Sequence, residues 1–467
     1  MPILLPLLAA AAASAPQPPL TPARIAEEVS QERLHAIVEK LVSFGTRHTL
    51  SSQTDPRRGI GASLNWAADE LGRYSRACGN CLAVVRPSDV VTGRRVPNPT
   101  RITDVVAIQR GSLDPNRVVI ITGHIDSRVT DVMNATADAP GANDDGSGTA
   151  AVIEAARVLS HHKFPYTIVY GVLMGEEQGL LGGKVLADYA KAQGWTVIAQ
   201  LNNDIIGNSC GSDGVCDDAH VRVISEGPRW QGHEDLAARQ RSLGGENDAP
   251  SRNISRWMDG LADDLALGLD VRQIWRSDRY GRGGDHLPFL DLGFPAVRLT
   301  VAIENYNWQH QDLRTENGIQ YGDTIDRMDF PYLAKVVKLN VAALAALARS
   351  PQPPEPQVEG AVSTDTTLTW RPVPGAAAYV VRWRPTDAAN WTNALRVAPA
   401  EAAPRPRTPE MAGVEPRVQN RVVLPHVRVD DFVFGVSSVS ADGYESPVAS
   451  AVPGGAFRPY TPPPPAQ

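Results

Sequence analysis

The sequence has few cysteines, no long apolar run and no long basic run, and each scarcity excludes a class of protein. Four cysteines among 467 residues are too few for a small scaffold held together by disulfides. No apolar stretch reaches the roughly 20 residues of a membrane-spanning helix, so the sequence predicts no span. The net charge of −7, without a basic run, argues against a nucleic-acid partner. What remains is a globular chain long enough for two or three domains.

The cysteines form two pairs that are close in sequence, Cys78 with Cys81 and Cys210 with Cys216. Four cysteines allow three pairings, and closeness favours these two short loops. A Cys-x-x-Cys can also be redox-active or half of a zinc site. However, no second such motif and no thioredoxin-like context accompany it. We therefore predict two structural disulfides in an exported protein.

The first residues agree with export. Residues 1–13 are apolar or small, and Ala13 and Ala15 resemble an A-x-A cleavage site, so residues 1–15 are interpreted as a signal peptide. No Lys or Arg precedes the apolar run, and cleavage after Ala13 is a second reading. A disordered alanine-rich start is the alternative. The predicted location is periplasmic or secreted.

Strands and helices alternate through most of the chain. Residues 23–42, 61–76 and 331–348 have helical apolar spacing, and short apolar runs lie between the helices. This alternation predicts an α/β fold with a mixed, mostly parallel sheet flanked by helices, within a domain over residues 16–350. Residues 226–284 are poorly periodic, and we expect them to cover a sheet edge and shape a pocket.

The pattern changes after residue 350. A Pro-rich linker is expected over 351–360, followed by alternating strands over 361–453 and a Pro-rich, disordered tail over 454–467. The alternation predicts a small all-β sandwich. Residues 370–376 (WRPVPGA), Tyr379 and residues 440–443 (SADG) resemble a fibronectin type III domain. Nothing catalytic stands out in it, so a spacer or stabilising role is expected.

Histidine and acidic residues follow three of the apolar runs. His124 and Asp126 follow residues 118–121, the pair Glu176 and Glu177 follows residues 167–174, and Asp204 follows residues 196–201. Such runs are typical of buried parallel strands, whose carboxyl ends meet at one edge of an α/β sheet. The sequence therefore predicts a metal site at that edge.

A glycine- and aspartate-rich turn at residues 141–148 (GANDDGSG) precedes a helical pattern. Alone it could be a helix cap formed by Asp145 or Ser147, and it lacks the lysine of a phosphate-binding loop. Beside the strand-end residues it would supply another carboxylate, Asp144. Mixed imidazole and carboxylate ligands suit zinc, and they also admit cobalt or manganese.

Five segments in this order resemble the M28 family of zinc peptidases, the co-catalytic aminopeptidases, and the resemblance covers roughly residues 23–348. They are residues 123–127 (GHIDS), 141–148 (GANDDGSG), 175–182 (GEEQGLLG), 201–207 (LNNDIIG) and 283–290 (GGDHLPFL).

The resemblance implies two zinc ions per chain. Asp144 would bridge them, Glu177 would bind one ion, and His124 with Asp204 would bind the other. Asp126 would orient His124, and Glu176 would be the general base that takes a proton from the attacking water.

The last ligand departs from the family pattern, which usually places a histidine directly after a tyrosine. Here Tyr306 is followed by Asn307, and the nearby histidine is His310. We assign His310 as the remaining ligand and keep Tyr306 and Arg282 as candidate substrate contacts.

The predicted function is a zinc aminopeptidase acting on peptides with a free N-terminus. A carboxypeptidase or dipeptidase is a close alternative, which would need a cationic clamp such as Arg279 and Arg282. A single-zinc glutaminyl cyclase belongs to another reaction class, and a non-catalytic binding protein would have lost ligands.

Overall fold

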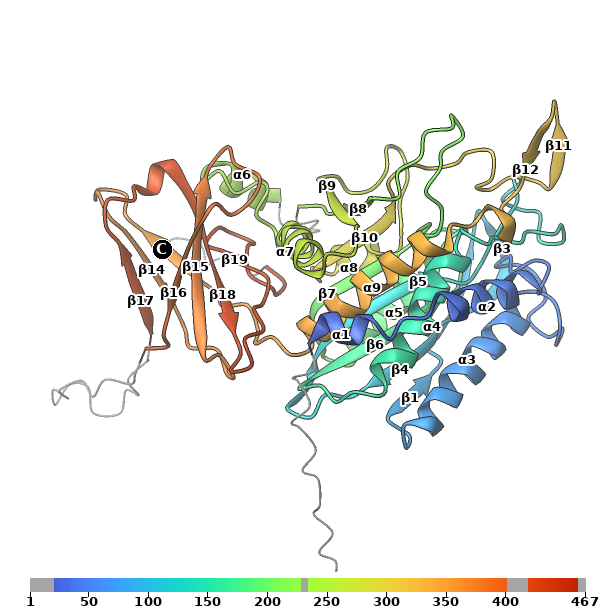
Figure 1. Cartoon of the computed structure of the whole chain (residues 1–467), viewed down its shortest axis with the longest axis horizontal. Coiled ribbons are helices and arrows are strands. Elements are labelled where there is room, and N and C mark those ends of the chain that lie inside the picture. The colour runs from blue at the N-terminus through green and yellow to red at the C-terminus, as the bar shows by residue number, and fades with distance from the viewer. Residues whose placement is uncertain (1–20, 228–233, 401–418, 461–467) are drawn as a thin grey trace, which may run out of the picture.

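The computed structural model describes residues 21–227, 234–400 and 419–460 (Figure 1). The predicted signal peptide lies outside these residues, as do residues 461–467 of the predicted tail. Residues 454–460, the first part of that tail, are ordered, which contradicts the prediction of disorder. Phe457 is 2% exposed and belongs to the main hydrophobic core.

An eight-stranded mixed sheet forms the centre of the larger part of the chain, as predicted. In spatial order the strands are β1 (Leu82–Val85), β4 (Val105–Gln109), β6 (Tyr166–Leu173), β5 (Asp114–His124), β7 (Thr196–Asn203), β10 (Ala296–Val301), β8 (His220–Ile224) and β9 (Asp270–Ile274). The four central strands β6, β5, β7 and β10 run parallel to one another, whereas β4 and β8 pair with them antiparallel.

Helices cover both faces of this sheet. Along β5, Val119 and Ile121 belong to one hydrophobic core and Val118 and Ile120 to the other, because successive side chains of a strand point to opposite faces. The first core contains residues of α1 (Pro22–Ala26), α2 (Gln31–Val42), α3 (Ile60–Ala77), α4 (Gly146–Leu159) and α9 (Phe330–Leu347). The second contains residues of α5 (Leu181–Ala192) and α8 (Leu287–Asp291).

One helix expected over residues 23–42 is in fact two. The Ser30 side chain accepts a hydrogen bond from the Arg33 amide (3.2 Å), which caps the start of α2. The Ser30 amide donates to Glu154 on α4 (2.9 Å). A serine in extended conformation satisfies a free amide at a helix start, so it separates α1 from α2.

Residues 226–284 are more regular than expected. They contain α6 (Glu234–Arg241), α7 (Pro250–Leu265) and β9. Along α7, Ile254 and Met258 are fully buried and Ala262 is 3% exposed, which is the spacing of one helical face. That spacing was present in the sequence and was missed among the surrounding charges.

Helix α9 is long and apolar enough to cross a membrane, but 83% of it is buried inside the protein. Within the described ranges it is the only helix of that kind. Its burial is that of a core helix packed between the sheet and the helices α1, α2 and α4.

Both predicted disulfides are present, Cys78–Cys81 and Cys210–Cys216. The second closes a short loop downstream of β7. The Cys210 carbonyl in this loop accepts a hydrogen bond from Asn305 (3.2 Å), so the loop is tied to the segment that leads to His310. Structural disulfides are typical of proteins that fold in oxidising compartments.

The C-terminal part contains two small antiparallel sheets. Leu368, Trp370 and Tyr379 lie between them in a separate hydrophobic core. One sheet has β13 (Gln357–Glu359), β14 (Thr366–Trp370) and β17 (Asn420–Leu424); the other has β16 (Asn393–Val397), β15 (Ala378–Pro385), β18 (Phe432–Val439) and β19 (Ala449–Ser450). Two hairpins form separate two-stranded sheets, β2 (Ser88–Gly93) with β3 (Val96–Thr103) and β11 (Arg314–Glu316) with β12 (Ile319–Tyr321). Ile102 of β3 is buried in the main hydrophobic core.

Helix α7 lies between the large sheet and the C-terminal sheets, and α6 lies next to the C-terminal sheets (Figure 1). Asp248, just before α7, is fully buried and pairs with Arg384 of β15 (2.6 Å). Asp248 also accepts a hydrogen bond from Ser450 of β19 (3.1 Å). From α7, Asn253 donates to Ser450 (2.8 Å) and Arg256 donates to the Ala389 carbonyl (2.6 Å). The C-terminal part is therefore docked through buried polar contacts.

Replacing Arg384 with Ala is expected to destabilise this junction strongly. The change leaves the buried Asp248 carboxylate without its closest cation, which costs about 3–5 kcal/mol for a buried pair. Arg382 lies on the same strand but pairs with Glu445 across side chains that are 28% and 30% exposed, so Arg382→Ala should cost at most about 1 kcal/mol. Thermal unfolding of both variants checks the difference. Equal midpoints would contradict a stabilising role for the buried pair.

Candidate metal centre

Three adjacent strands deliver the predicted residues to one edge of the sheet. His124 is the last residue of β5, Glu176 and Glu177 follow β6, and Asp204 follows β7. Asp144 lies in the turn before α4. This turn approaches β7 closely, because a Cβ at Gly148 would lie 2.3 Å from the carbonyl oxygen of Asn203. Only glycine fits there.

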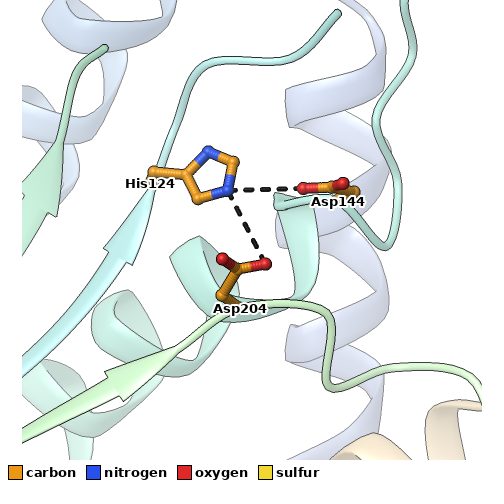
Figure 2. Close-up of side chains that lie close together, drawn as sticks. All are labelled: His124, Asp144 and Asp204. Atoms are coloured by element: carbon orange, nitrogen blue, oxygen red, sulfur yellow. Dashed lines mark ion pairs between the residues drawn. The ribbon is translucent and has the colours of Figure 1, made fainter. Parts of the chain in front are cut away.

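His124, Asp144 and Asp204 form the first group of possible metal ligands (Figure 2). The His124 Nε2 atom lies 3.3 Å from Asp144 Oδ1 and 3.8 Å from Asp204 Oδ1. All three side chains are buried. The sticks in Figure 2 show both carboxylates pointing at the same nitrogen atom.

Asp144, Glu177 and His310 form the second group. The His310 Nε2 atom lies 2.8 Å from Asp144 Oδ2 and 3.0 Å from Glu177 Oε1. Asp144 thus turns one carboxylate oxygen to each histidine and belongs to both groups. The five residues predicted as ligands are brought together, including His310, whose assignment rested on the weakest pattern.

These residues fit a divalent metal ion. In each group the possible ligand atoms lie within 4.8 Å of one another. Within the described part of the chain, His124 Nε2 and Glu177 Oε1 are buried and have no hydrogen-bond partner. Buried polar atoms without partners are rare, and imidazole with carboxylate is a donor set typical of zinc.

The carboxylates raise the pKa of both histidines. Burial disfavours the imidazolium of His310, but Glu177 and Asp144 outweigh it and raise the pKa to about 10. In the same way, Asp126, Asp144 and Asp204 overcome burial and raise the pKa of His124 well above its usual value. A metal ligand must be deprotonated, so protons compete with a metal here and affinity should fall as the pH is lowered.

Glu176 lines a cavity onto which residues of both groups also open. Burial, together with the charges of Asp204 and Glu177, raises the pKa of Glu176 well above its usual value, although His124 opposes this shift. Its neighbour Glu177 points instead to His310. The two adjacent glutamates therefore face different partners.

Asp126 contacts more than the imidazole it was expected to orient. The carbonyl oxygen of Asp126 lies 3.0 Å from His124 Nδ1, closer than its carboxylate (3.4 Å). The carboxylate accepts hydrogen bonds from the amides of Gly175 (2.9 Å), Glu176 (3.3 Å) and Glu177 (3.2 Å). It also accepts one from the Thr49 hydroxyl (2.7 Å).

Two further aspartates position Asp144. Asp145 caps α4 by accepting from the Gly148 amide (2.8 Å) and also binds the His124 amide (3.0 Å). Asp323 accepts from the amide of Asp144 itself (2.7 Å). The peptide bond between Asp144 and Asp145 is cis. Asp145 was one of the two capping residues considered from the sequence, whereas Asp323 lies in no motif and had no signal.

Two arginines contact the predicted ligands and were missed. The fully buried Arg298 lies 2.8 Å from Asp204 Oδ2. Arg128 lies 2.8 Å from Glu177 Oε2 and 2.6 Å from His310 Nδ1. An arginine inside the apolar strand β10 was a signal for Arg298, because a buried cation requires a partner.

Left-handed backbone occurs beside the site segments. Leu180, Ile205 and His310 have φ angles of 60°, 59° and 57°. Ile205 follows Asp204 directly, and Leu180 caps the start of α5 three positions after Glu177. Such conformations cost non-glycine residues on the order of 1–3 kcal/mol and concentrate at functional sites.

A cavity of about 410 Å³ opens onto both groups, and its lining includes Arg282 and Arg279. This size is within the range of small-ligand pockets. Tyr306 does not line it and is 59% exposed. Of the two candidate substrate contacts, the structure thus brings only Arg282 to the cavity.

Comparison with known proteins agrees with this geometry. A family model described as peptidase family M28 matches residues 104–330, a range that contains both groups. A probable zinc metalloprotease of Leptosphaeria maculans is 43% identical over 433 residues, which cover 92% of this chain and 96% of the relative. A second, from Pyrenophora teres f. teres, is 42% identical over 446 residues, covering 94% and 88%.

The crystal structure of LapA from Legionella pneumophila resembles the fold, with a TM-score of 0.51 and 19% identity over 69% of this chain and 74% of that one. At this identity the likeness concerns the fold alone. The sequence identity to the two metalloproteases, in contrast, extends over nearly the whole length of each protein. The chain therefore belongs to peptidase family M28.

Proposed function

We propose that this member of the M28 family is a zinc-dependent exopeptidase that removes N-terminal residues from peptides. The observation that carries the proposal is Asp144, which turns one oxygen to each of two histidine-containing groups. That arrangement suits two ions held side by side, with His124 and Asp204 on one and Glu177 and His310 on the other. Bound zinc would polarise the scissile carbonyl and lower the pKa of the attacking water.

Glu176 is the proposed general base. It lines the cavity next to both groups, and burial raises its pKa, which makes its carboxylate a stronger base for the proton of the attacking water, which it would then pass to the leaving amine. Asp126 would hold Glu176 and Glu177 in position through the successive amides of that turn. Arg298 would fix Asp204 so that one of its oxygens remains directed at His124.

An amino-terminal substrate agrees with the charges around the two groups. Of the four carboxylates that line the cavity, those of Asp144, Glu177 and Asp204 would hold metal, so Glu176 is the acidic partner that remains for an ammonium group of the substrate. The cavity volume of about 410 Å³ suits one or two residues of a peptide rather than an extended chain.

We further propose that the protein is exported and that the C-terminal sheets form a fibronectin type III-like domain over about residues 361–453, next to a peptidase domain over residues 16–350. The two disulfides support an oxidising compartment. The sheets of three and four antiparallel strands support the sandwich. A spacer or stabilising role agrees with the contacts of this domain to α7.

Mass spectrometry of a mixed peptide pool incubated with the protein, with and without a chelator, tests the function. Loss of N-terminal residues that the chelator prevents is the expected result. Chelator-sensitive loss of ammonia from peptides that begin with Gln would instead identify a glutaminyl cyclase. Trimming from the C-terminus would make the enzyme a carboxypeptidase, and an unchanged pool would contradict peptidase activity.

A further inference from the structure

Several arginines line the cavity beside the two groups of possible metal ligands. Its lining contains four guanidinium groups and four carboxylates, so their formal charges cancel before any metal binds. Each divalent ion would add two positive charges to this wall. The arginines are Arg95, Arg128, Arg279 and Arg282.

Two of these arginines are held by acidic residues of the protein. Arg279 is 8% exposed and contacts Asp278 (3.2 Å) and Glu304 (3.2 Å). Arg128 is bound to the predicted ligand Glu177. The charges of both arginines are therefore balanced by carboxylates of the protein, and their guanidinium groups are already bound to these partners.

Arg282 is more open. Its side chain is 32% exposed and pairs with Glu304, a carboxylate that Arg222 and Arg279 also contact. Three cations thus contact Glu304, and one of them, Arg279, also pairs with Asp278. Arginine has five N–H donors, and besides Glu304 the guanidinium of Arg282 contacts the Gln309 side chain at 3.3 Å, so donors remain for a ligand.

Gln309 links Arg282 to Asp144, the carboxylate shared by both groups of possible metal ligands. Its amide nitrogen donates to Asp144 Oδ2 (3.2 Å), while its amide oxygen accepts from Arg282 (3.3 Å). A single amide group therefore separates this guanidinium from the carboxylate shared by both groups. When the scissile bond of a substrate lies at the metal centre, the substrate groups next to that bond would lie near Arg282.

Arg95 approaches the cavity from a different segment, the turn of the β2–β3 hairpin. It is exposed and donates to the carbonyl oxygen of Glu177 (3.0 Å). Within the described ranges no carboxylate lies in ion-pair distance of Arg95. Two available cations from distant segments therefore line one cavity.

We propose that Arg282 and Arg95 bind a carboxylate of the peptide substrate, so that the enzyme prefers substrates with an anionic group next to the scissile bond. This inference rests on the proposed aminopeptidase function and names its substrate class. The guanidinium fork matches a carboxylate through two parallel hydrogen bonds. The carboxylate could be the acidic side chain of an N-terminal Glu or Asp, or the C-terminal carboxylate of a dipeptide.

Two matched substrate pairs distinguish these sources, using the zinc-loaded full-length protein. Glutamyl and glutaminyl p-nitroanilides differ only in the side-chain carboxylate, and Leu-Gly and Leu-Gly-amide differ only in the terminal one. We expect kcat/KM to favour the carboxylate of at least one pair by about tenfold or more. Arg282→Gln should bring that ratio close to one, and Arg95→Gln should reduce it.

Neighbouring arginines outside the cavity are the controls. Arg276 is an exposed arginine six residues before Arg282, and Arg94 is exposed beside Arg95. Arg276→Gln and Arg94→Gln should keep the wild-type ratio. Zinc content and the thermal midpoint of every variant show whether a changed ratio reflects recognition rather than misfolding.

The outcomes separate the inference from the function on which it rests. An active enzyme with ratios near one for both pairs, or with ratios that survive in Arg282→Gln and Arg95→Gln, would overturn the carboxylate site alone. If no substrate is hydrolysed, the proposed function fails, and calorimetry with the same two matched pairs as unhydrolysed ligands still decides the inference. Tighter binding of the carboxylate member of either pair that Arg282→Gln abolishes would support the site, and equal binding within both pairs would overturn it.

Discussion

Glu176→Gln is expected to lower kcat by about 10²- to 10⁴-fold, the usual contribution of a general base, while the protein keeps its zinc. Gln has the shape of Glu but cannot accept the proton of the attacking water. Glu176 is not a member of either group of possible ligands, and the Asp126 carboxylate holds the backbone amide of residue 176 whatever its side chain. Metal binding and stability should therefore change little.

The adjacent residue provides the matched comparison. Glu177 Oε1 lies 3.0 Å from His310 Nε2 in the second group, so Glu177→Gln should lower zinc content together with activity. Steady-state kinetics and metal analysis of both variants separate the two roles. Near-normal turnover by Glu176→Gln would remove Glu176 as the base, and loss of zinc from that variant would make it a ligand instead.

Asp144→Asn is expected to have the largest effect on metal binding, because Asp144 is the one residue common to both groups. Burial opposes the charge of Asp144, but His310 and His124 outweigh it and hold its pKa well below the usual range. Its negative charge is therefore present at neutral pH. Losing a residue that only supports a ligand weakens metal affinity by about 10–100-fold, so loss of this shared carboxylate should exceed that and abolish activity.

Asp204→Asn serves as the comparison, because Asp204 belongs only to the first group. If two ions bind, this variant should retain one of them, whereas Asp144→Asn should retain neither tightly. Metal analysis after dialysis measures the stoichiometry directly. One ion in the wild-type protein would contradict the two-metal proposal and favour the single-zinc alternative.

Much of the site was predictable because parallel strands bring their carboxyl ends together. His124, the Glu176 and Glu177 pair, and Asp204 follow apolar runs that form the neighbouring strands β5, β6 and β7. The sequence therefore placed them at one edge without knowledge of any contact. His310 is different, since it follows no strand, and its assignment depended on the family resemblance.

The supporting residues could not be predicted, because they depend on contacts between segments far apart in the chain. Asp323 binds the Asp144 amide across 179 positions, and no local pattern marks it. Thr49 and Arg128 likewise lie in loops whose path only the folded structure defines. Arg298 was the exception, since a cation within an apolar strand already requires a buried partner.

The relation between the two parts of the chain was also beyond the sequence. The proline-rich residues after 350 suggest a C-terminal unit whose removal would leave measurable catalysis. In the structure this unit packs against α7, and Asp248 and Arg256 are buried beside its strands. Truncation after residue 350 would expose these charged groups. It would also remove Phe457 from the main core, so the protein should lose stability together with any change in activity.

The contacts of Asp126 couple two segments that are distant in the sequence, residues 124–126 and 175–177. A single residue holds the His124 ring through its carbonyl oxygen and three successive amides, residues 175–177, through its carboxylate. A displacement of either segment is therefore transmitted to the other through one side chain. Substitutions in the 124–126 and 175–177 segments should consequently have non-additive effects in double-mutant cycles, and natural variation at one segment should be tolerated only together with compensating change at the other.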